Sequence, residues 1–215
     1  MSQYKDYGYT TANNDHTENY LVDNILSLLN KNKNKLILDV GCGNGWLTAI
    51  LLQNGFEVYG TDASKNGIKI ANQRKECQIE QGGKKRFFLQ DLSTDSLPTE
   101  LVDFKFDTII STEVIEHLYD PRKYISFCKH ILQQNKGGEI LLTTPYHGYL
   151  KNLLLSITGK MDTHFSALWD GGHIKFWSKK TLTQLLEEAD FKVTHFIGCG
   201  RLPFLWKSML VKAQL

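Results

Sequence analysis

Short apolar runs alternate along the chain with segments of helical periodicity. The runs are rich in β-branched and aromatic residues, as is typical of strands, and they cover residues 36–40, 57–60, 86–89, 106–110 and 139–143. Apolar residues at three- and four-residue spacing predict helices over 19–29, 46–53, 65–75 and 122–134. This alternation predicts an α/β fold, a doubly wound parallel sheet with helices on both faces.

The pattern changes after the fifth predicted strand. Residues 145–177 mix aromatic, glycine and histidine residues with one helix-like stretch at 149–157. The mixture does not continue the strand-helix alternation, and we interpret it as an insert that covers the sheet.

The end of the chain returns to regular periodicity. Ser178 is predicted to be the N-cap of an amphipathic helix over 181–188. Two final strands are predicted at 191–197 and 208–213. The sheet is therefore expected to close with a strand pair.

Composition limits the domain count and the class of partner. The 215 residues are 41% apolar, enough to build one core, so residues 1–215 are predicted to form a single domain with 1–34 as an N-terminal helical cap. Lys and Arg number 25 against 23 Asp and Glu, a net charge of +2. So small a charge favours neither nucleic acid nor an anionic membrane as partner. The sequence does not indicate an oligomeric state.

Cellular location is predicted from what the sequence lacks. It has no apolar run long enough to span a bilayer and no apolar signal segment at its start. Its four cysteines are scattered without paired spacing, which favours reduced thiols over a disulfide frame or a zinc site. We therefore expect a cytoplasmic protein.

A glycine-rich turn follows the first predicted strand directly, before a helix. Its sequence is Asp39-Val-Gly41-Cys42-Gly43-Asn44-Gly45. Glycines permit a tight turn that brings backbone close to a ligand, and a helix start offers free N–H groups. Such a turn alone is a weak signal, because many strand-to-helix turns contain glycine.

Acidic residues at the next strand ends strengthen this interpretation. Asp62 follows the second strand, where a carboxylate can accept both hydroxyls of a ribose. Asp91, between Gln90 and Leu92, follows the third strand and could meet the amino group and ring face of an adenine. Either aspartate could instead cap the segment that follows it. Together with the turn they predict a nucleoside site.

A nicotinamide-binding domain is the main rival for this site. Its fingerprint is G-x-G-x-x-G, whereas here the third glycine comes one residue earlier and Asp39 stands just before the turn. A carboxylate there would repel a pyrophosphate but suits the amino group and sulfonium of S-adenosylmethionine. The pattern therefore favours S-adenosylmethionine.

The sequence resembles the class I S-adenosylmethionine-dependent methyltransferases over residues 36–145. The resemblance is carried by residues 38–45 (Leu-Asp-Val-Gly-Cys-Gly-Asn-Gly), Asp62, 90–92 (Gln-Asp-Leu) and 113–118 (Glu-Val-Ile-Glu-His-Leu). Glu-Val-Ile-Glu-His and the later Gly-Gly-His are most similar to the ubiquinone-biosynthesis O-methyltransferases (the methyltransferase type 11/12 group). They are similar, more distantly, to the small-RNA 3′-terminal 2′-O-methyltransferases.

The resemblance implies a Rossmann-like seven-stranded sheet in the order 3-2-1-4-5-7-6, with strand 7 antiparallel. It also implies site roles. Asp39 and 41–45 would hold the methionine part, Asp62 the ribose, and Thr112 would lie beside the sulfonium. The full set of cofactor-binding residues that we predict is Asp39, Gly41, Cys42, Gly43, Gly45, Asp62, Ala63, Gln90, Asp91, Leu92 and Thr112.

A second group of residues suggests catalysis or a metal. Glu113, Glu116 and His117 have the spacing i, i+3, i+4 and share one face if their segment is helical. The resemblance adds His173, and implies that these four bind Mg²⁺ or another divalent metal, which could lower the pKa of a hydroxyl and position it. In a metal-free alternative they shape the pocket, with His117 as a base or hydrogen-bond donor and His173 as a second catalytic or structural residue.

The acceptor is predicted to be a small molecule. Seven aromatic or imidazole side chains of the insert could close over a mostly apolar ligand or simply pack on the sheet: Tyr146, His147, Tyr149, Phe165, Trp169, Phe176 and Trp177. We predict O-methylation of a hydroxylated small molecule. The alternatives are RNA 2′-O-methylation, which the near-neutral charge disfavours, and a non-catalytic binding protein, which the intact Asp39 and glycine turn disfavour.

Overall fold

The computed structural model describes residues 8–11, 19–78, 85–92, 96–165, 167–169 and 171–215. These residues contain a seven-stranded sheet in the order β3-β2-β1-β4-β5-β7-β6. β7 runs antiparallel to both β5 and β6, and the other pairs are parallel, which confirms the expected strand order and the antiparallel strand 7. The strands are β1 (Leu36–Val40), β2 (Glu57–Asp62), β3 (Phe87–Leu89), β4 (Thr108–Thr112), β5 (Glu139–Pro145), β6 (Lys192–Cys199) and β7 (Ser208–Gln214).

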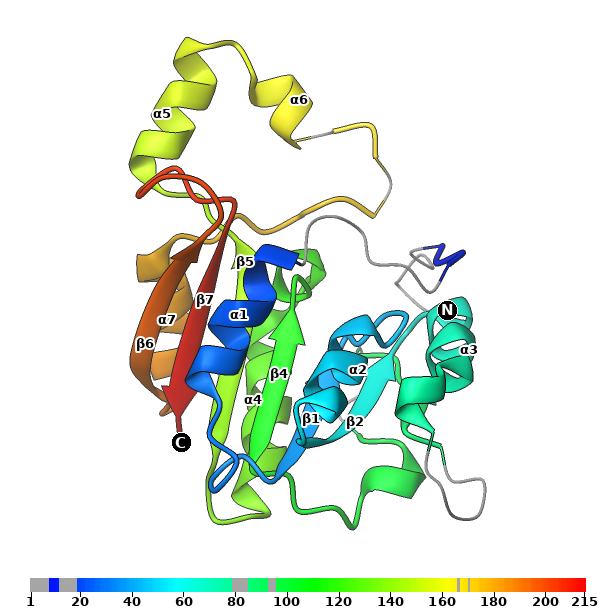
Figure 1. The fold of residues 1–215 in the computed structure, drawn as a ribbon. Coiled ribbons are helices and arrows are strands. Elements are labelled where there is room, and N and C mark those ends of the chain that lie inside the picture. The colour runs from blue at the N-terminus through cyan, green and yellow to red at the C-terminus, as the bar shows by residue number, and fades with distance from the viewer. Residues whose placement is uncertain (1–7, 12–18, 79–84, 93–95, 166, 170) are drawn as a thin grey trace.

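Helices cover both faces of the sheet (Figure 1). On one face, Leu21 of α1 and Leu51 of α2 are buried against Ile110 of β4. On the other, Ile131 of α4 and Leu182 of α7 are buried in a second core cluster. The helices of this α/β frame are α1 (Asn19–Leu28), α2 (Trp46–Gln53), α3 (Lys65–Gln73), α4 (Pro121–Gln133) and α7 (Lys179–Glu187).

Several elements extend beyond or stop short of the predicted bounds. β2 continues to Asp62 because its pairing with β3 continues past the apolar run. The third helix ends at Gln73, and a 3-10 turn, Lys75–Cys77, follows it. The predicted cap of the last helix is confirmed, since the Ser178 hydroxyl accepts a hydrogen bond from the Thr181 N–H at 3.3 Å. A further 3-10 turn, Thr99–Leu101, precedes β4.

The insert stands beyond the carboxyl ends of β4 and β5 (Figure 1). It carries the predicted helix, α5 (Tyr149–Ile157), and a short second helix, α6 (Met161–Phe165). Its two ends meet at its base, where the His147 N–H donates to the Trp177 carbonyl at 2.9 Å. The insert therefore leaves and rejoins the frame at one point.

Candidate active site

A pocket with a volume of about 940 Å³ opens at the carboxyl ends of β1, β2 and β4 and extends beneath the insert. Its wall contains most of the residues predicted for the site: Asp39, Gly41, Cys42, Gly43, Asp62, Ala63, Leu92, Thr112, Glu113, His117 and His173. Four predicted residues are not part of the wall: Gly45, Gln90, Asp91 and Glu116. One cavity thus joins the predicted cofactor positions to the predicted catalytic group.

The glycine turn is fixed against β2. The N–H groups of Gly41 and Cys42 both donate to the Thr61 carbonyl, at 2.7 and 3.0 Å. Gly41 has φ +83°, and a Cβ at this position would collide with the Val114 side chain. Gly45 has φ +74° and begins α2, where a Cβ would meet Ala71 and Phe87. Gly41 therefore shapes the pocket, whereas Gly45 serves the packing behind it.

Backbone N–H groups hold Asp62 in place at the end of β2. One carboxylate oxygen accepts from the Gly43 N–H at 2.8 Å and the other from the Ser64 N–H at 2.7 Å. Asp39 is fully buried and accepts from the Thr48 hydroxyl at 2.6 Å. Burial, followed by the charges of Asp39 and Asp62, raises the pKa of the Cys42 thiol well above its usual range. This end of the pocket is therefore electronegative and suits a cationic ligand.

The third strand end differs from the expected arrangement. Gln90 is buried behind the pocket wall and its amide donates to the Ser96 carbonyl at 2.9 Å, so it supports the loop. Asp91 also lies off the wall, and only Leu92 of this triplet lines the pocket. The next residues, 93–95, lie outside the described chain. Tyr9 lines the pocket against the glycine turn.

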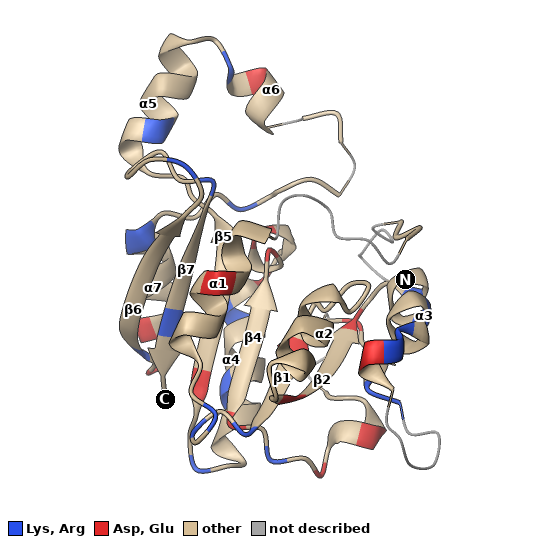
Figure 2. Cartoon of the chain, in the orientation of Figure 1, with Lys and Arg blue, Asp and Glu red and all other residues tan. Residues whose placement is uncertain are grey.

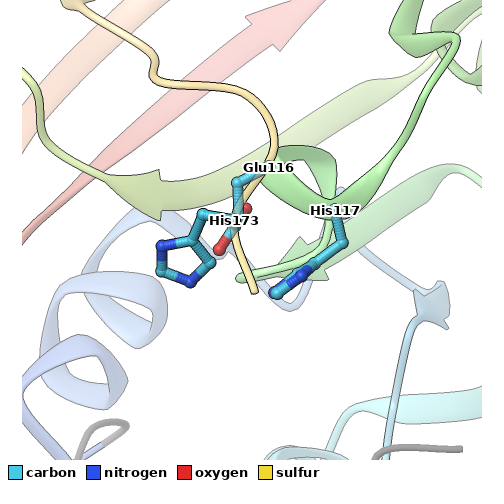
Figure 3. Close-up of side chains that lie close together, drawn as sticks. All are labelled: Glu116, His117 and His173. Carbon is cyan, nitrogen blue, oxygen red and sulfur yellow. The ribbon is translucent and has the colours of Figure 1, made fainter. Parts of the chain in front are cut away.

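Three of the residues predicted for catalysis or metal binding, Glu116, His117 and His173, converge beneath the insert (Figure 3). Each offers one potential ligand atom, and these atoms lie within 4.8 Å of one another. Glu116 and His117 come from a 3-10 turn after β4, Ile115–His117, and His173 comes from the segment of the insert that returns to the frame. The turn and the insert are joined because two N–H groups of the insert, those of residues 174 and 175, donate to the Glu116 carbonyl at 2.9 and 3.0 Å.

Burial controls the protonation of this group. It lowers the pKa of His173 to about 4, with the neighbouring His117 as the next cause, and it lowers the pKa of His117 against the effect of two backbone carbonyls. Burial and then the charge of Glu113 raise the pKa of Glu116 well above its usual range. No hydrogen bond of normal geometry reaches either Glu116 oxygen from the described residues. The group therefore presents two neutral imidazoles beside a buried carboxyl.

Glu113 does not join this group, and the expectation that it shares a helical face with Glu116 and His117 is wrong. It has φ +53°, because its N–H continues the β4 pairing by donating to the Thr143 carbonyl at 3.1 Å. Its side chain accepts from the Thr143 hydroxyl at 3.0 Å and the Ser208 hydroxyl at 3.2 Å. Burial, opposed by these two hydroxyls, raises the pKa of Glu113 to about 7.

The aromatic side chains of the insert divide between two places. Phe165 and Trp169 line the pocket, and His147 stacks on Phe165 with ring centroids 5.8 Å apart. Tyr146 is buried against Trp206, with ring centroids 5.0 Å apart. Phe176 meets Phe165 edge to face, and Trp177 packs on the core, whereas Tyr149 is 82% exposed. Only part of the predicted aromatic set therefore lines the pocket.

Sequence reasoning missed a further set of wall residues. They come from α1, the insert, the connection between β6 and β7, and the first residue of β7: Tyr20, Lys151, His164, Arg201, Lys207 and Ser208. The hydroxyls of Tyr20 and Ser208 lie 2.7 Å apart. No local motif marks these residues. The only available signal is the expected sheet order, which places β7 beside β5 and hence the β6–β7 connection near the pocket.

The strand order, with the pocket at the carboxyl ends of the strands, defines the class as a Rossmann-like methyltransferase fold. A family model described as a methyltransferase domain matches residues 14–196. The chain belongs to this methyltransferase-domain family.

Two curated relatives are named as ubiquinone biosynthesis O-methyltransferases. The protein of Dinoroseobacter shibae is 30% identical over 71% of this chain and 58% of its own length. The human mitochondrial protein is 31% identical over 78% of this chain and 44% of its own length. The chain thus spans about half the length of these relatives.

A solved structure shares the fold. Magnesium protoporphyrin IX methyltransferase of Synechocystis PCC 6803, with bound SAH, has a TM-score of 0.65 and 22% identity, covering 90% of this chain and 81% of the other. Among the helices that the structure describes, none combines the length and the apolar character needed to cross a bilayer.

Proposed function

We propose that this protein transfers a methyl group from S-adenosylmethionine to a hydroxyl oxygen of a small molecule. The observation that carries the proposal is the pocket whose wall joins most of the predicted cofactor positions to His117 and His173, with Glu116 buried beside these two histidines. Family membership, the names of the relatives and the SAH-bound structure support it.

The electronegative end of the pocket is the proposed cofactor site. Asp62 would accept the ribose hydroxyls, since its carboxylate is already oriented by two N–H groups. The buried Asp39 would favour the positive methionine end, and Leu92 would contact the adenine. Thr112, at the end of β4, would lie beside the sulfonium. When bound, S-adenosylmethionine supplies an electrophilic methyl group.

The opposite end would orient and deprotonate the acceptor. The bound cofactor would supply its methyl group for direct displacement by the acceptor oxygen and would leave as S-adenosylhomocysteine, and the residues at this end would hold that oxygen toward the cofactor. His117 and His173 line the pocket and are neutral near pH 7, so either can accept the hydroxyl proton. Most of the acceleration would come from alignment.

A divalent metal fits Glu116, His117 and His173. Neutral imidazoles and carboxylates are metal ligands, and a buried carboxyl without a well-formed hydrogen bond would be stabilised by a nearby cation. If bound here, Mg²⁺ or Mn²⁺ would lower the pKa of the acceptor hydroxyl. The proposed ligand set differs from the sequence prediction in omitting Glu113.

Calorimetric titration with S-adenosylhomocysteine tests the cofactor site. Wild type should bind, and Asp62→Ala should weaken binding by about a hundredfold, because a charged hydrogen-bond acceptor is removed. Asp103→Ala, a change of an exposed aspartate, is the matched control. Preference for NAD, or no binding by wild type, would overturn the proposal.

Turnover assays test the remaining alternatives. Activity with small phenols that is lost with EDTA and restored by Mg²⁺ or Mn²⁺ supports the metal role, whereas activity indifferent to both leaves the histidines as bases. Methylation of RNA in preference to small phenols would favour the RNA alternative. Cofactor binding without turnover on either substrate class would favour a non-catalytic binding protein.

A further inference from the structure

A buried lysine lies at the end of the pocket away from the cofactor positions. Lys151, in the first turn of α5, is only 6% exposed and lines the pocket. Its ammonium donates to the carbonyls of Tyr146 at 2.7 Å and Lys207 at 3.4 Å. An ammonium has three N–H donors, so these two carbonyls leave one for the pocket.

Lys151 is buried without a carboxylate in direct contact among the residues that the structure describes. It forms no ion pair with the carboxylates of the described residues. The charge of Glu113 raises the pKa of Lys151, but the hydrogen bonds that the two Glu113 oxygens accept come from the hydroxyls of Thr143 and Ser208. Burying a charge without a counter-ion is costly, and a neutral donor could hold the same two carbonyls at lower cost. Holding the insert to the frame therefore does not explain why residue 151 carries a positive charge.

Two further cations line the same part of the pocket. Arg201 lies in the connection between β6 and β7, and Lys207 is the last residue of this connection. Burial, and then the charge of Arg201, lowers the pKa of Lys151 to about 8. Burial, followed by the charges of Lys151 and Arg201, also lowers the pKa of His164, on α6. The positive potential therefore extends across the space between the insert and the β6–β7 connection.

Figure 2 shows Lys and Arg, and no Asp or Glu, on α5 and on the adjoining β6–β7 connection. The sequence agrees, because residues 149–157 and 200–207 contain no acid. Arg201 forms no hydrogen bond or ion pair with the described residues, and it is held in a left-handed backbone conformation at φ +70°. Strained positions of this kind cluster at ligand sites.

We propose that Lys151, Arg201 and Lys207 bind an anionic group, a carboxylate or a phosphate, of a small methyl acceptor. The inference rests on the proposed function for the identity of the ligand as acceptor. The acceptor hydroxyl would lie near His117 and His173, its ring would lie under Phe165, and its anionic group would meet the three cations. This anion subsite would select acidic acceptors over neutral ones of the same size.

Equilibrium binding tests the subsite without knowledge of the natural acceptor. The full chain, saturated with S-adenosylhomocysteine, is titrated with benzoate, phenyl phosphate and neutral benzyl alcohol while NMR shifts are followed. At least one of the two anions should bind about tenfold more tightly than benzyl alcohol, and the comparison between them tells carboxylate from phosphate. Equal binding of all three probes would overturn the proposal.

Substitutions of the pocket cations test whether the anion binds at the proposed subsite. Arg201→Gln, which removes no hydrogen bond or ion pair with the described residues, and Lys151→Met should each reduce anion affinity by about fivefold or more. Lys160→Gln, a change on the insert at an exposed lysine outside the pocket wall, should leave it unchanged. Arg201→Gln keeps the test valid if Lys151→Met fails to fold. Anion binding unchanged in Arg201→Gln and in folded Lys151→Met would overturn the proposal.

Two other outcomes separate this subsite from its alternatives. A short oligoribonucleotide that binds more tightly than phenyl phosphate, and weakens in the same variants, would assign the cations to RNA and overturn the small-molecule subsite. Failure of S-adenosylhomocysteine to bind, with anion binding measured in its absence intact and sensitive to the variants, would overturn the cofactor proposal while supporting the anion subsite.

Discussion

The two ends of the pocket are built in different ways. In the proposed assignment, the cofactor end is made of short segments at the carboxyl ends of β1, β2 and β4, where backbone N–H groups fix the Asp62 carboxylate. The acceptor end is assembled from α1, the insert and the β6–β7 connection, and hydroxyl and cationic side chains line it. The carboxyl ends of the strands fix the residues of the cofactor end. The acceptor end depends on segments that can change in sequence without disturbing the sheet.

Replacing the helical part of the insert should produce the largest difference between the two ends of the pocket. A variant with residues 150–164 exchanged for a short glycine-serine linker should lose turnover by about a thousandfold, because acceptor alignment is lost. Its affinity for S-adenosylhomocysteine should stay within about threefold of wild type, since the cofactor end does not use this segment. Calorimetry and a turnover assay measure the two effects, and equal loss of both would show that the ends are not independent.

A pair of glycine substitutions compares the two ends directly. Gly41 and Gly171 both have positive φ, +83° and +98°, but a Cβ on Gly41 would collide with Val114 whereas Gly171 faces open space. Gly41→Ala should therefore cost about 3 kcal/mol of unfolding free energy, and Gly171→Ala about 1 kcal/mol. Denaturant unfolding gives both values. Equal costs would mean that the glycine turn is not tightly packed.

The acceptor end should show its own dependence on pH. Burial, followed by the charge of Lys151, lowers the pKa of His147 to about 4. As the pH falls below 6.5, the unfolded chain takes up the proton first, so the folded state should lose about 2 kcal/mol by pH 4. His147→Gln should remove that part of the slope in unfolding experiments at several pH values. His195→Gln, at an exposed position on β6, should leave the slope as it is.

The smallest effect is expected where α1 meets β7. Tyr20→Phe removes the hydroxyl that lies 2.7 Å from the Ser208 hydroxyl, and should cost about 1 kcal/mol of unfolding free energy. Affinity for S-adenosylhomocysteine should not change. Tyr149→Phe is the matched control, because Tyr149 is 82% exposed. A large loss of cofactor affinity in Tyr20→Phe would connect the two ends.

The frame was predictable because its signals are local, and so was the placement of most residues of the proposed cofactor end at one pocket wall. Apolar periodicity located the strands and most helices to within a few residues, and the residues at the strand ends identified Asp39, the glycine turn and Asp62. Boundaries moved where backbone pairing continued past an apolar run, as at Asp62. One prediction at these strand ends differs from the structure, because the Gln90 side chain is directed away from the pocket and supports the loop.

The acceptor end was poorly predictable because its residues meet only through tertiary structure. Glu113 has helical spacing to Glu116, but backbone pairing with Thr143 holds it in a conformation that no helix contains. Lys151 and Arg201 are 50 residues apart by number, and in the sequence each is typical of a solvated surface. The insert itself was visible as a change of pattern, although the depth at which it buries Lys151 was not.

The hydrogen bond between the His147 N–H and the Trp177 carbonyl closes the insert at its base. Residues 148–176 consequently begin and end at one place, and their length can change without shifting β5 or α7. Evolution could thus replace this segment as a unit. Such a replacement would change which compounds are methylated and would leave the proposed site of the methyl donor as it is.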